Sequence, residues 1–302
     1  MKKRDIFSIF PEMLRQPLVH GGFTQQNLRE LRIRAERPLI VNSSGRERIL
    51  DRRFTGAEVG EILAYLGNYS LYAWEDEIRQ GFLSLPGGHR VGIAGKTVLE
   101  CGKVRTLSEV SSLNIRFAHE VKGCADGVLP HLWEGGRLCH TLFVSAPGRG
   151  KTTLLRDCIR QISDGRGEHP GMTVGLVDER SEIAGSFCGI PSNDVGLRTD
   201  VLDGCQKAEG LMMLIRSMSP DVVAADEVGS PEELAALRHA MNCGCTLLAT
   251  THGDSPEELK RKPVLAEMIG TALFERYVFL ENGKEPGRIR MILDGQYRNI
   301  KV

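Results

Sequence analysis

The sequence predicts an α/β protein with two domains, a smaller α+β domain over residues 1–125 and a doubly covered parallel sheet over residues 126–302. From about residue 140 onward, apolar strand-like runs alternate with amphipathic helical runs, which is typical of parallel strands with helices on both faces. A glycine-rich run at residues 145–153 follows the first of these strands and leads into a helix. Ligands of such sheets bind at the carboxyl ends of the strands, so this run marks the candidate site.

The first domain contains short apolar runs separated by polar turns, which is the pattern of strands. The predicted strands, which we expect to form a mixed sheet, are residues 30–34, 38–41 and 90–94. Residues 84–91 contain Pro-Gly-Gly between two apolar stretches and predict two strands joined by a glycine turn. Thr55 and Glu58 have the spacing of a capping box, so a helix is predicted to begin there.

The second domain is predicted to contain five strands, at residues 141–145, 172–178, 221–226, 245–251 and 275–281. The first four are mostly apolar, as expected for strands that are buried on both faces. Amphipathic helices are predicted between them, for example from Ala208 to Met218. Residues 288–293 predict a closing antiparallel strand.

The run at residues 145–153, Ser-Ala-Pro-Gly-Arg-Gly-Lys-Thr-Thr, has the residue types that bind a nucleotide triphosphate with Mg²⁺. Gly148 and Gly150 allow the backbone to wrap around the β-phosphate. Lys151 reaches the β- and γ-phosphate oxygens, and the hydroxyl of Thr152 is a ligand for the metal.

Two features of the sequence bear on this match. The usual loop opens with glycine five residues before the Gly-Lys pair, where this chain has Ser145. A second Gly-Lys-Thr run, at residues 95–97, follows no glycine-rich stretch and therefore predicts a β-turn. The run at residues 145–153 differs because a strand precedes it and a helix follows it, which is the context that a phosphate loop requires.

Acidic residues follow two of the later strands. Asp226 and Glu227 come directly after a buried-type strand, and hydrolysis of a triphosphate needs one carboxylate near Mg²⁺ and another to orient or deprotonate the attacking water. Asp226 suits the metal and Glu227 suits the water. Asp178, Glu179 and Arg180 end another strand, and form either a second functional group or a solvated loop with a local ion pair.

Three further residues are open between a functional and a structural role. His252 follows the strand at 245–251, where it can contact the γ-phosphate and report its presence, or act as a hydrogen-bonded structural residue. Arg198 and Arg216 can neutralise phosphate charge, in the same subunit or in a neighbour, or form surface ion pairs.

The composition weighs against several classes of protein. The 302 residues include 39 basic and 39 acidic side chains, and this zero net charge argues against a protein that wraps nucleic acid with a uniformly basic surface. No run reaches the ~18 apolar residues of a spanning helix, and residues 6–10 are too short for a signal-peptide core, so we expect a cytoplasmic chain. The eight cysteines lack zinc-site spacing and are expected to be buried reduced thiols.

Four motifs together resemble those of a known superfamily. The loop at 145–153, Asp178-Glu179-Arg180, Asp226-Glu227 and Thr251-His252-Gly253 resemble, in that order, the Walker A, Asp, Walker B and His boxes of the RecA-like type II and type IV secretion ATPases. Longer runs are more specific and resemble the stage III sporulation protein AA family. These are residues 177–185, 193–205, 207–221, 86–92 and 111–116. The resemblance covers nearly the whole chain.

This resemblance implies an ATPase of endospore-forming bacteria with a RecA-like P-loop ATPase domain at residues 126–302. It implies a hexameric ring with ATP between subunits and a contribution from the N-terminal domain, so that Arg90 and Arg116 are candidates for neutralising phosphate charge. It also implies a location in the mother-cell cytoplasm, peripheral at the membrane through membrane proteins of a sporulation channel complex. Ser145 departs from the superfamily loop, and we expect altered loop geometry rather than lost binding.

The motifs predict ATP hydrolysis with ATP and Mg²⁺ as cofactors, and the resemblance implies a secretion-type motor that powers a membrane channel or secretion-like complex. The predicted phosphate-binding residues are Ala146, Pro147, Gly148, Arg149, Gly150, Lys151, Thr152 and Thr153. Thr152 and Asp226 hold the metal, Glu227 prepares the water, and Lys151, Glu179 and His252 assist catalysis.

Two alternative functions remain. One is a nucleotide-gated structural ring with little turnover, against which the intact Asp226-Glu227 pair weighs. The other is a RecA-like nucleic-acid translocase, against which the zero net charge weighs, so no nucleic-acid partner is expected.

Overall fold

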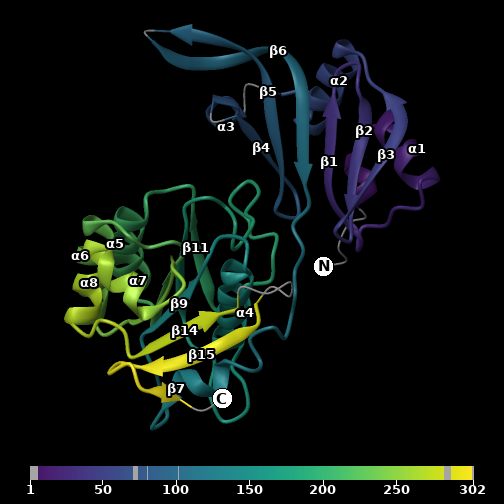
Figure 1. Cartoon of the computed structure of the whole chain (residues 1–302). Coiled ribbons are helices and arrows are strands. Elements are labelled where there is room, and N and C mark those ends of the chain that lie inside the picture. The colour runs from purple at the N-terminus through teal and green to yellow at the C-terminus, as the bar shows by residue number, and fades with distance from the viewer. Residues whose placement is uncertain (1–5, 71–73, 80, 101, 282–286, 301–302) are drawn as a thin grey trace. The chain divides into compact units, whose positions relative to one another are not determined.

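The computed structural model describes residues 6–70, 74–79, 81–100, 102–281 and 287–300. The chain folds into two compact units, Met1–His119 and Glu120–Val302, each with its own sheet and its own buried core (Figure 1). Among the described residues, no helix has both the length and the apolar character needed to cross a membrane.

The sheet of the first unit has six strands in the order β3-β2-β1-β6-β5-β4, and every neighbouring pair is antiparallel. The prediction of a mixed sheet is therefore wrong, because most consecutive strands are joined by short turns that reverse the chain. The strands are β1 (Leu28–Arg34), β2 (Pro38–Ser43), β3 (Arg46–Arg53), β4 (Phe82–Leu85), β5 (His89–Glu100) and β6 (Lys103–Arg116). The helices are η1 (Ile6–Ile9), α1 (Glu12–His20), α2 (Gly56–Leu66) and α3 (Glu75–Arg79).

Helix α2 begins where the sequence predicts it. The Thr55 side chain accepts a hydrogen bond from the Glu58 N–H, and the Glu58 carboxylate accepts one from the Thr55 N–H at 2.8 Å, which completes the capping box. Its apolar face, which includes Val59 and Ile62, is buried in the core of the first unit.

The second Gly-Lys-Thr run, at residues 95–97, lies inside β5, so the prediction of a β-turn is wrong. β5 and β6 continue beyond their neighbours as a two-stranded ribbon, and the register shifts on both sides of Gly95 (Figure 1). A Cβ atom at Gly95 would lie 2.8 Å from the Glu109 carbonyl oxygen and 2.8 Å from the Val110 Cα. Glycine is therefore required by the close approach of two strands rather than by a turn.

The sheet of the second unit has eight strands in the order β11-β10-β12-β13-β9-β14-β15-β16. The strands from β11 to β14 are parallel, and β15 and β16 add antiparallel pairs. All five predicted strands and the closing strand are present, as β9 (Thr141–Ser145), β10 (Val174–Asp178), β12 (Val222–Ala225), β13 (Thr246–His252), β14 (Arg276–Leu280) and β15 (Ile289–Asp294). Strands β11 (Thr199–Asp203) and β16 (Asn299–Ile300) were not predicted.

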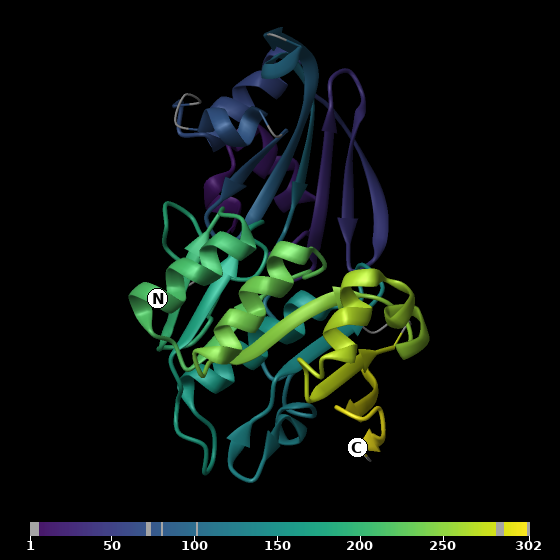
Figure 2. The same cartoon turned by 90° about the vertical axis from the view of Figure 1, so that its left-hand side faces the viewer.

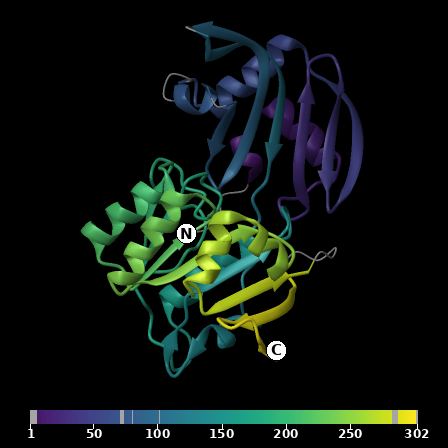
Figure 3. The ribbon, with the colours of Figure 1, turned by 60° about the vertical axis from the view of Figure 1, so that its left-hand side comes forward.

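Helices cover both faces of this sheet. The helices are α4 (Lys151–Asp164), α5 (Lys207–Met218), α6 (Pro231–Asn242), α7 (Pro256–Arg261) and α8 (Pro263–Gly270), and a short hairpin of η3 (Leu129–Leu132), β7 (Trp133–Glu134) and β8 (Arg137–Leu138) precedes β9. In β9, Leu142 and Val144 belong to the cluster that contains α5, α6 and α8, whereas Phe143 belongs to the cluster that contains α4. The same layering can be followed from other directions in Figures 2 and 3.

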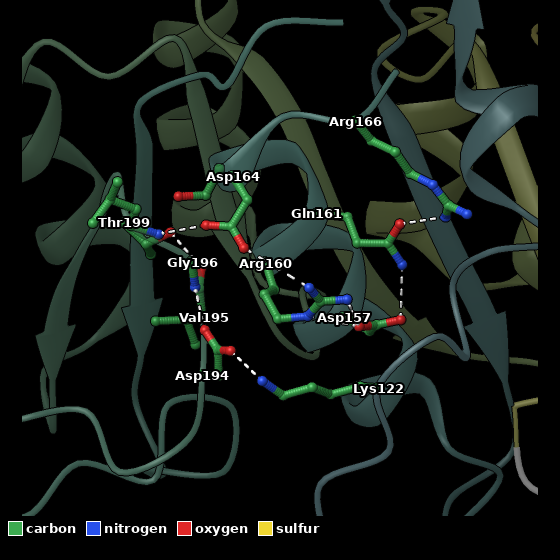
Figure 4. Close-up of polar contacts among 12 residues, drawn as sticks. Lys122, Asp157, Arg160, Gln161, Asp164, Arg166, Asp194, Val195, Gly196 and Thr199 are labelled. Carbon is green, nitrogen blue, oxygen red and sulfur yellow. Dashed lines mark hydrogen bonds and ion pairs between the residues drawn. The ribbon is translucent and has the colours of Figure 1, made fainter. Parts of the chain in front are cut away.

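The first residues of the second unit are held on α4 by polar contacts (Figure 4). The Ala125 N–H donates to the Asp157 carboxylate at 2.9 Å, and the Arg160 guanidinium donates to the same carboxylate at 2.7 Å. Asp157 is only 3% exposed, and Lys122 forms an ion pair with Asp194 nearby. Helix α4 therefore connects the glycine-rich loop at its start with the segment 120–126, which contacts Asp157 in its middle and Gln161 in its second half.

The seven described cysteines are free thiols. Cys188 and Cys243 are exposed, so the prediction of buried thiols is wrong for these two, and Cys101 lies outside the described residues. Among the described residues, no group of three or more His, Cys, Asp or Glu side chains is arranged to hold a metal ion.

Candidate functional site

The glycine-rich loop (residues 146–150) joins the end of β9 to the start of α4. Gly148 and Gly150 have φ angles of 72° and 89°, in the left-handed region that side chains with a Cβ rarely occupy. Gly150 is the N-cap of α4 and makes no side-chain cap, so the first N–H groups of the helix are left for another acceptor. A helix start of this kind favours an anion.

Ser145, which stands where the usual loop has glycine, is the last residue of β9 and is 1% exposed. Its φ is not among the positive values of the chain, so a serine fits this position without backbone strain. Its carbonyl oxygen accepts a hydrogen bond from Lys151 Nζ at 2.9 Å, and its hydroxyl lies 3.4 Å from the same nitrogen. The serine therefore adds a polar neighbour to the lysine.

Lys151 is the first residue of α4 and is 5% exposed. Besides Ser145, its ammonium donates to the Ala146 carbonyl at 3.2 Å and to His252 Nδ1 at 3.0 Å. Burial lowers the pKa of Lys151, and the nearby Asp226 and Glu227 carboxylates oppose that effect. The lysine is thus held at the loop by three groups that a phosphate oxygen can replace.

Thr152 and Asp226 lie side by side although they are far apart in the sequence. The Thr152 hydroxyl donates to Asp226 Oδ2 at 2.7 Å. The other oxygen of Asp226 accepts a hydrogen bond from the buried Thr250 hydroxyl, so β13 fixes the carboxylate that follows β12. A hydroxyl and a carboxylate are hard oxygen ligands of the kind that Mg²⁺ prefers.

Glu227 has a φ of 51°, which is uncommon for a residue with a side chain. Its N–H donates to Thr250 Oγ1 at 2.9 Å, which holds the backbone in this conformation. Its carboxylate pairs with Arg180 at 3.0 Å and with His252 Nε2 at 2.9 Å. Strained backbone held by its surroundings is a feature of functional sites.

His252 connects the lysine of the loop to this glutamate. Its Nδ1 lies 3.0 Å from Lys151 Nζ and its Nε2 lies 2.9 Å from Glu227 Oε1. An ammonium has hydrogens only to donate, so Nδ1 accepts and Nε2–H donates to the carboxylate. The imidazole is therefore hydrogen-bonded to Lys151 and Glu227 at the same time.

Asp178 has a different place from the other acids of the strand ends. It is 2% exposed, and its carboxylate accepts hydrogen bonds from the N–H groups of Glu182, Ile183 and Ala184, at 2.9, 3.0 and 2.7 Å. Burial raises the pKa of Asp178 to about 6, although these three N–H groups act in the opposite direction. Asp178 thus shapes the loop after β10.

Glu179 and Arg180 face the site from the same loop. Arg180 pairs with Glu227, and Glu179 accepts a hydrogen bond from Lys207 at 2.8 Å. A pocket at the strand ends is lined by seven charged side chains, five acidic and two basic. They are Asp178, Glu179, Arg180, Glu182, Lys207, Asp226 and Glu227. The excess of acidic groups makes this pocket suited to a cation rather than to a further anion.

Arg198 and Arg216, the candidate arginines of the second unit, do not join this site. Arg198 precedes β11, a strand parallel to β10, so it lies at the opposite edge of the sheet from the carboxyl ends. Its guanidinium donates to the Ser163 carbonyl at 2.9 Å, near the end of α4. Arg216 is exposed in the last turn of α5. In the first unit, Arg90 stacks over Phe82, 3.7 Å from the ring centroid, and Arg116 is exposed near Glu30.

Sequence reasoning did not identify Thr250, Lys207 or Glu233, which hold the site together. Thr250 lies two positions before His252 on the strand that ends at the site, and this register could have indicated it. Lys207 is the first residue of α5, and Glu233 lies in the first turn of α6. The 3.0 Å ion pair between Lys207 Nζ and Glu233 Oε1 depends on how these two helices pack. No local pattern in the sequence carries that information.

Comparison with solved structures shows the class of fold. The ATPase DotB of Legionella pneumophila aligns with a TM-score of 0.63 and 16% identity, over 95% of this chain and 81% of that chain. The pilus retraction motor PilT, solved with bound ADP, aligns with a TM-score of 0.60 and 15% identity, over 96% and 82%. At these identities the likeness shows the fold alone, and it is the predicted RecA-like P-loop ATPase fold.

Sequence comparison then shows the family. The model of the family described as sporulation stage III, protein AA, matches residues 1–300, and this chain belongs to that family, as its motifs predict. Stage III sporulation protein AA of Bacillus subtilis strain 168 is 40% identical over 291 residues, which cover 96% of this chain and 94% of that protein. The protein SEEDLING PLASTID DEVELOPMENT 1 of Arabidopsis thaliana is 26% identical over 87% of this chain but only 35% of its own length.

Proposed function

We propose that this protein binds ATP with Mg²⁺ at the carboxyl ends of β9, β12 and β13 and hydrolyses it. The proposal rests on one observation, which is that Lys151, the Thr152–Asp226 pair and Glu227 lie together at the glycine-rich loop. A phosphate-binding ammonium, a pair of metal ligands and a positioned carboxylate are the parts that phosphoryl transfer to water requires.

The residues have distinct roles in this proposal. Lys151 exchanges its contacts with the Ser145 and Ala146 carbonyls for phosphate oxygens, and the N–H groups at the start of α4 bind the same phosphates. Thr152 and Asp226 would hold Mg²⁺, which would neutralise charge on the phosphates, and two protein ligands suit an ion that commonly retains water. Glu227 orients and deprotonates the attacking water. Arg149, Thr153, Glu179 and His252 complete the site.

We further propose that hydrolysis drives a secretion-type motor. The support is the shared fold with DotB and PilT and the membership of a sporulation family. In this proposal the chain forms a homo-oligomer, a hexamer, in the cytoplasm of the mother cell and acts on membrane proteins of a channel complex during endospore formation. Arg90 or Arg116 of the first unit then neutralises phosphate charge at an active site shared between subunits.

Phosphate release by the full-length chain tests the catalytic proposal. Glu227→Gln is expected to lower turnover by about 10²–10⁴-fold, the range that a general base contributes, while fluorescent ATP still binds. Lys151→Ala is expected to weaken nucleotide binding itself. Glu168→Gln, at an exposed turn beyond the far end of α4, is the matched control and keeps the activity of the unchanged chain.

Unchanged turnover in Glu227→Gln would contradict the catalytic assignment. The assembly proposal has its own measurement, which is mass in solution with and without an ATP analogue, together with turnover at increasing protein concentration. A rate that rises faster than linearly with concentration is expected for a site shared between subunits. A strictly linear rate and a monomeric mass in both states would overturn the shared site.

A second candidate function is a nucleotide-gated ring with little turnover. The observation that favours it is that the catalytic groups are engaged with one another, since Lys151 contacts His252 and Glu227 contacts both His252 and Arg180. ATP binding without phosphate release in the oligomeric protein supports this candidate over the first.

A further inference from the structure

Lys207 occupies an unusual position for a buried cation. It is the first residue of α5, where the helix dipole disfavours positive charge, and the residue is 9% exposed. Neither burial nor a position at a helix N-terminus stabilises a lysine that has no partner. Its ammonium must therefore be compensated by specific partners.

Two carboxylates from different elements supply that compensation. Lys207 Nζ lies 2.8 Å from Glu179 Oε2, on the loop after β10, and 3.0 Å from Glu233 Oε1, in the first turn of α6. Burial alone lowers the pKa of Lys207, but the hydrogen bonds to Glu179 and Glu233 outweigh this and raise it, so the residue is a cation at neutral pH.

The two glutamates differ in what else they contact. Glu233 also accepts hydrogen bonds from the Gly229 and Ser230 N–H groups, at 2.7 and 2.9 Å, and so belongs to the capping box of α6. Glu179 lines the acidic pocket next to Asp226 and Glu227. Carboxylates that line one pocket repel each other, so Glu179 needs an anchor to remain beside Asp226 and Glu227.

We propose that Lys207 is a positioning residue that holds the Glu179 carboxylate in the pocket, anchored in turn by Glu233 on the rigid start of α6. This proposal rests on the proposed ATPase function and assigns Lys207 a part in it. In its held position Glu179 accepts a hydrogen bond from a water of the pocket, either the attacking water or one bound to the metal. Lys207 itself acts through Glu179 and not on the nucleotide.

The test compares four full-length proteins. Lys207→Met keeps the length of the side chain and removes its charge, and is expected to lower kcat by about 10–100-fold, as loss of an outer partner of a metal site does. KM for ATP and the affinity for fluorescent ATP with Mg²⁺ are expected to stay unchanged, because Lys207 pairs with Glu179 and Glu233 and not with a group of the phosphate loop. Lys207→Arg restores a donor to both glutamates and is expected to recover most of kcat.

Glu168→Gln, at the exposed turn beyond the far end of α4, is the control. It replaces a glutamate by its amide at a position that does not line the pocket, so kcat is expected to stay unchanged. If Lys207 had only a structural role, Lys207→Met would lower the thermal midpoint and the nucleotide affinity together with kcat. The kcat values of Lys207→Met and Lys207→Arg would then differ little.

The outcomes separate this proposal from the one on which it rests. If the unchanged protein releases phosphate and Glu227→Gln does not, but Lys207→Met keeps the full kcat, the Lys207 proposal alone fails. It also fails if Lys207→Met loses nucleotide binding or its folded state along with turnover. If the unchanged protein binds ATP but shows no turnover in its oligomeric form, the proposed ATPase function fails, and the role of Lys207 fails with it.

Discussion

Asp178 allows a quantitative prediction, because it is a buried carboxylate with an elevated pKa. In the folded protein this pKa is about 6, against an ordinary value of 3.8. Between those values the folded state holds a proton that the unfolded state has released, so stability falls as the pH rises. The full difference corresponds to about 3 kcal/mol of stability, which is present below pH 3.8 and lost above pH 6.

The perturbation is Asp178→Asn, which is close in shape to the protonated acid and does not titrate. Relative to the unchanged protein, the variant is expected to become more stable with rising pH, by about 2.4 kcal/mol between pH 4 and pH 7. Other titrating groups cancel in the comparison. Asp200→Asn, at an exposed position of β11, is the control for removing a carboxylate from the same unit.

The assay is urea unfolding at several pH values followed by tryptophan fluorescence. The chain has two tryptophans, Trp74 in the first unit and Trp133 in the second, so a Trp74→Phe background reports the unit that contains Asp178. A difference between variant and unchanged protein that stays constant from pH 4 to pH 7 would refute the reasoning. The carboxylate would then be ionised in the folded state throughout, stabilised by its three N–H donors.

Two further predictions concern other parts of the chain. Gly95→Ala is expected to destabilise the first unit by about 1–3 kcal/mol, because its Cβ would press on the β6 backbone, whereas Gly60→Ala, with open space in α2, is expected to stabilise it by up to ~1 kcal/mol. Trp74 fluorescence in a Trp133→Phe background measures both, and equal effects would contradict the contact argument. Thr250→Val removes the partner of the Asp226 carboxylate and the Glu227 N–H and is expected to lower turnover about 10–100-fold, with Thr250→Ser restoring it. Normal phosphate release by Thr250→Val would show that Asp226 and Glu227 hold their places unaided.

The parallel sheet could be predicted because its strands are apolar on both faces and its helices are amphipathic. β9 and β12 match their predicted ranges within one residue at either end. β11, with the sequence Thr-Asp-Val-Leu-Asp, is a half-exposed edge strand and has no apolar run to mark it. In the first unit, the alternation of apolar residues is the same in parallel and antiparallel strands and gives no direction. The short connections give it, since three residues between the predicted strands 30–34 and 38–41 are too few for a parallel crossover.

Part of the candidate site could likewise be predicted from the sequence, and part could not. Lys151, Thr152, Asp226 and Glu227 follow from motifs at strand ends, and the structure brings them together. Asp178 and Glu179 are adjacent in the sequence and both line the pocket, yet Asp178 is buried against three backbone N–H groups whereas Glu179 pairs with Lys207. Alternation along an extended chain gives neighbours different surroundings, but which of the two is buried depends on packing that the sequence does not display.

The attachment of residues 120–126 to α4 has a mechanical consequence. The chain that leaves the first unit contacts Asp194 through Glu120 and Lys122, and then the middle of α4 through the Ala125–Asp157 hydrogen bond. A force applied along the chain at Glu120 therefore acts on Asp194 and α4 before it reaches any strand of the second sheet. Asp157 lies six residues after Lys151, which is about 9 Å along the helix axis, so the force is applied within two turns of the phosphate loop. A fragment that begins at residue 126 would lack the Ala125–Asp157 hydrogen bond but keep the contact of Asp126 with Gln161.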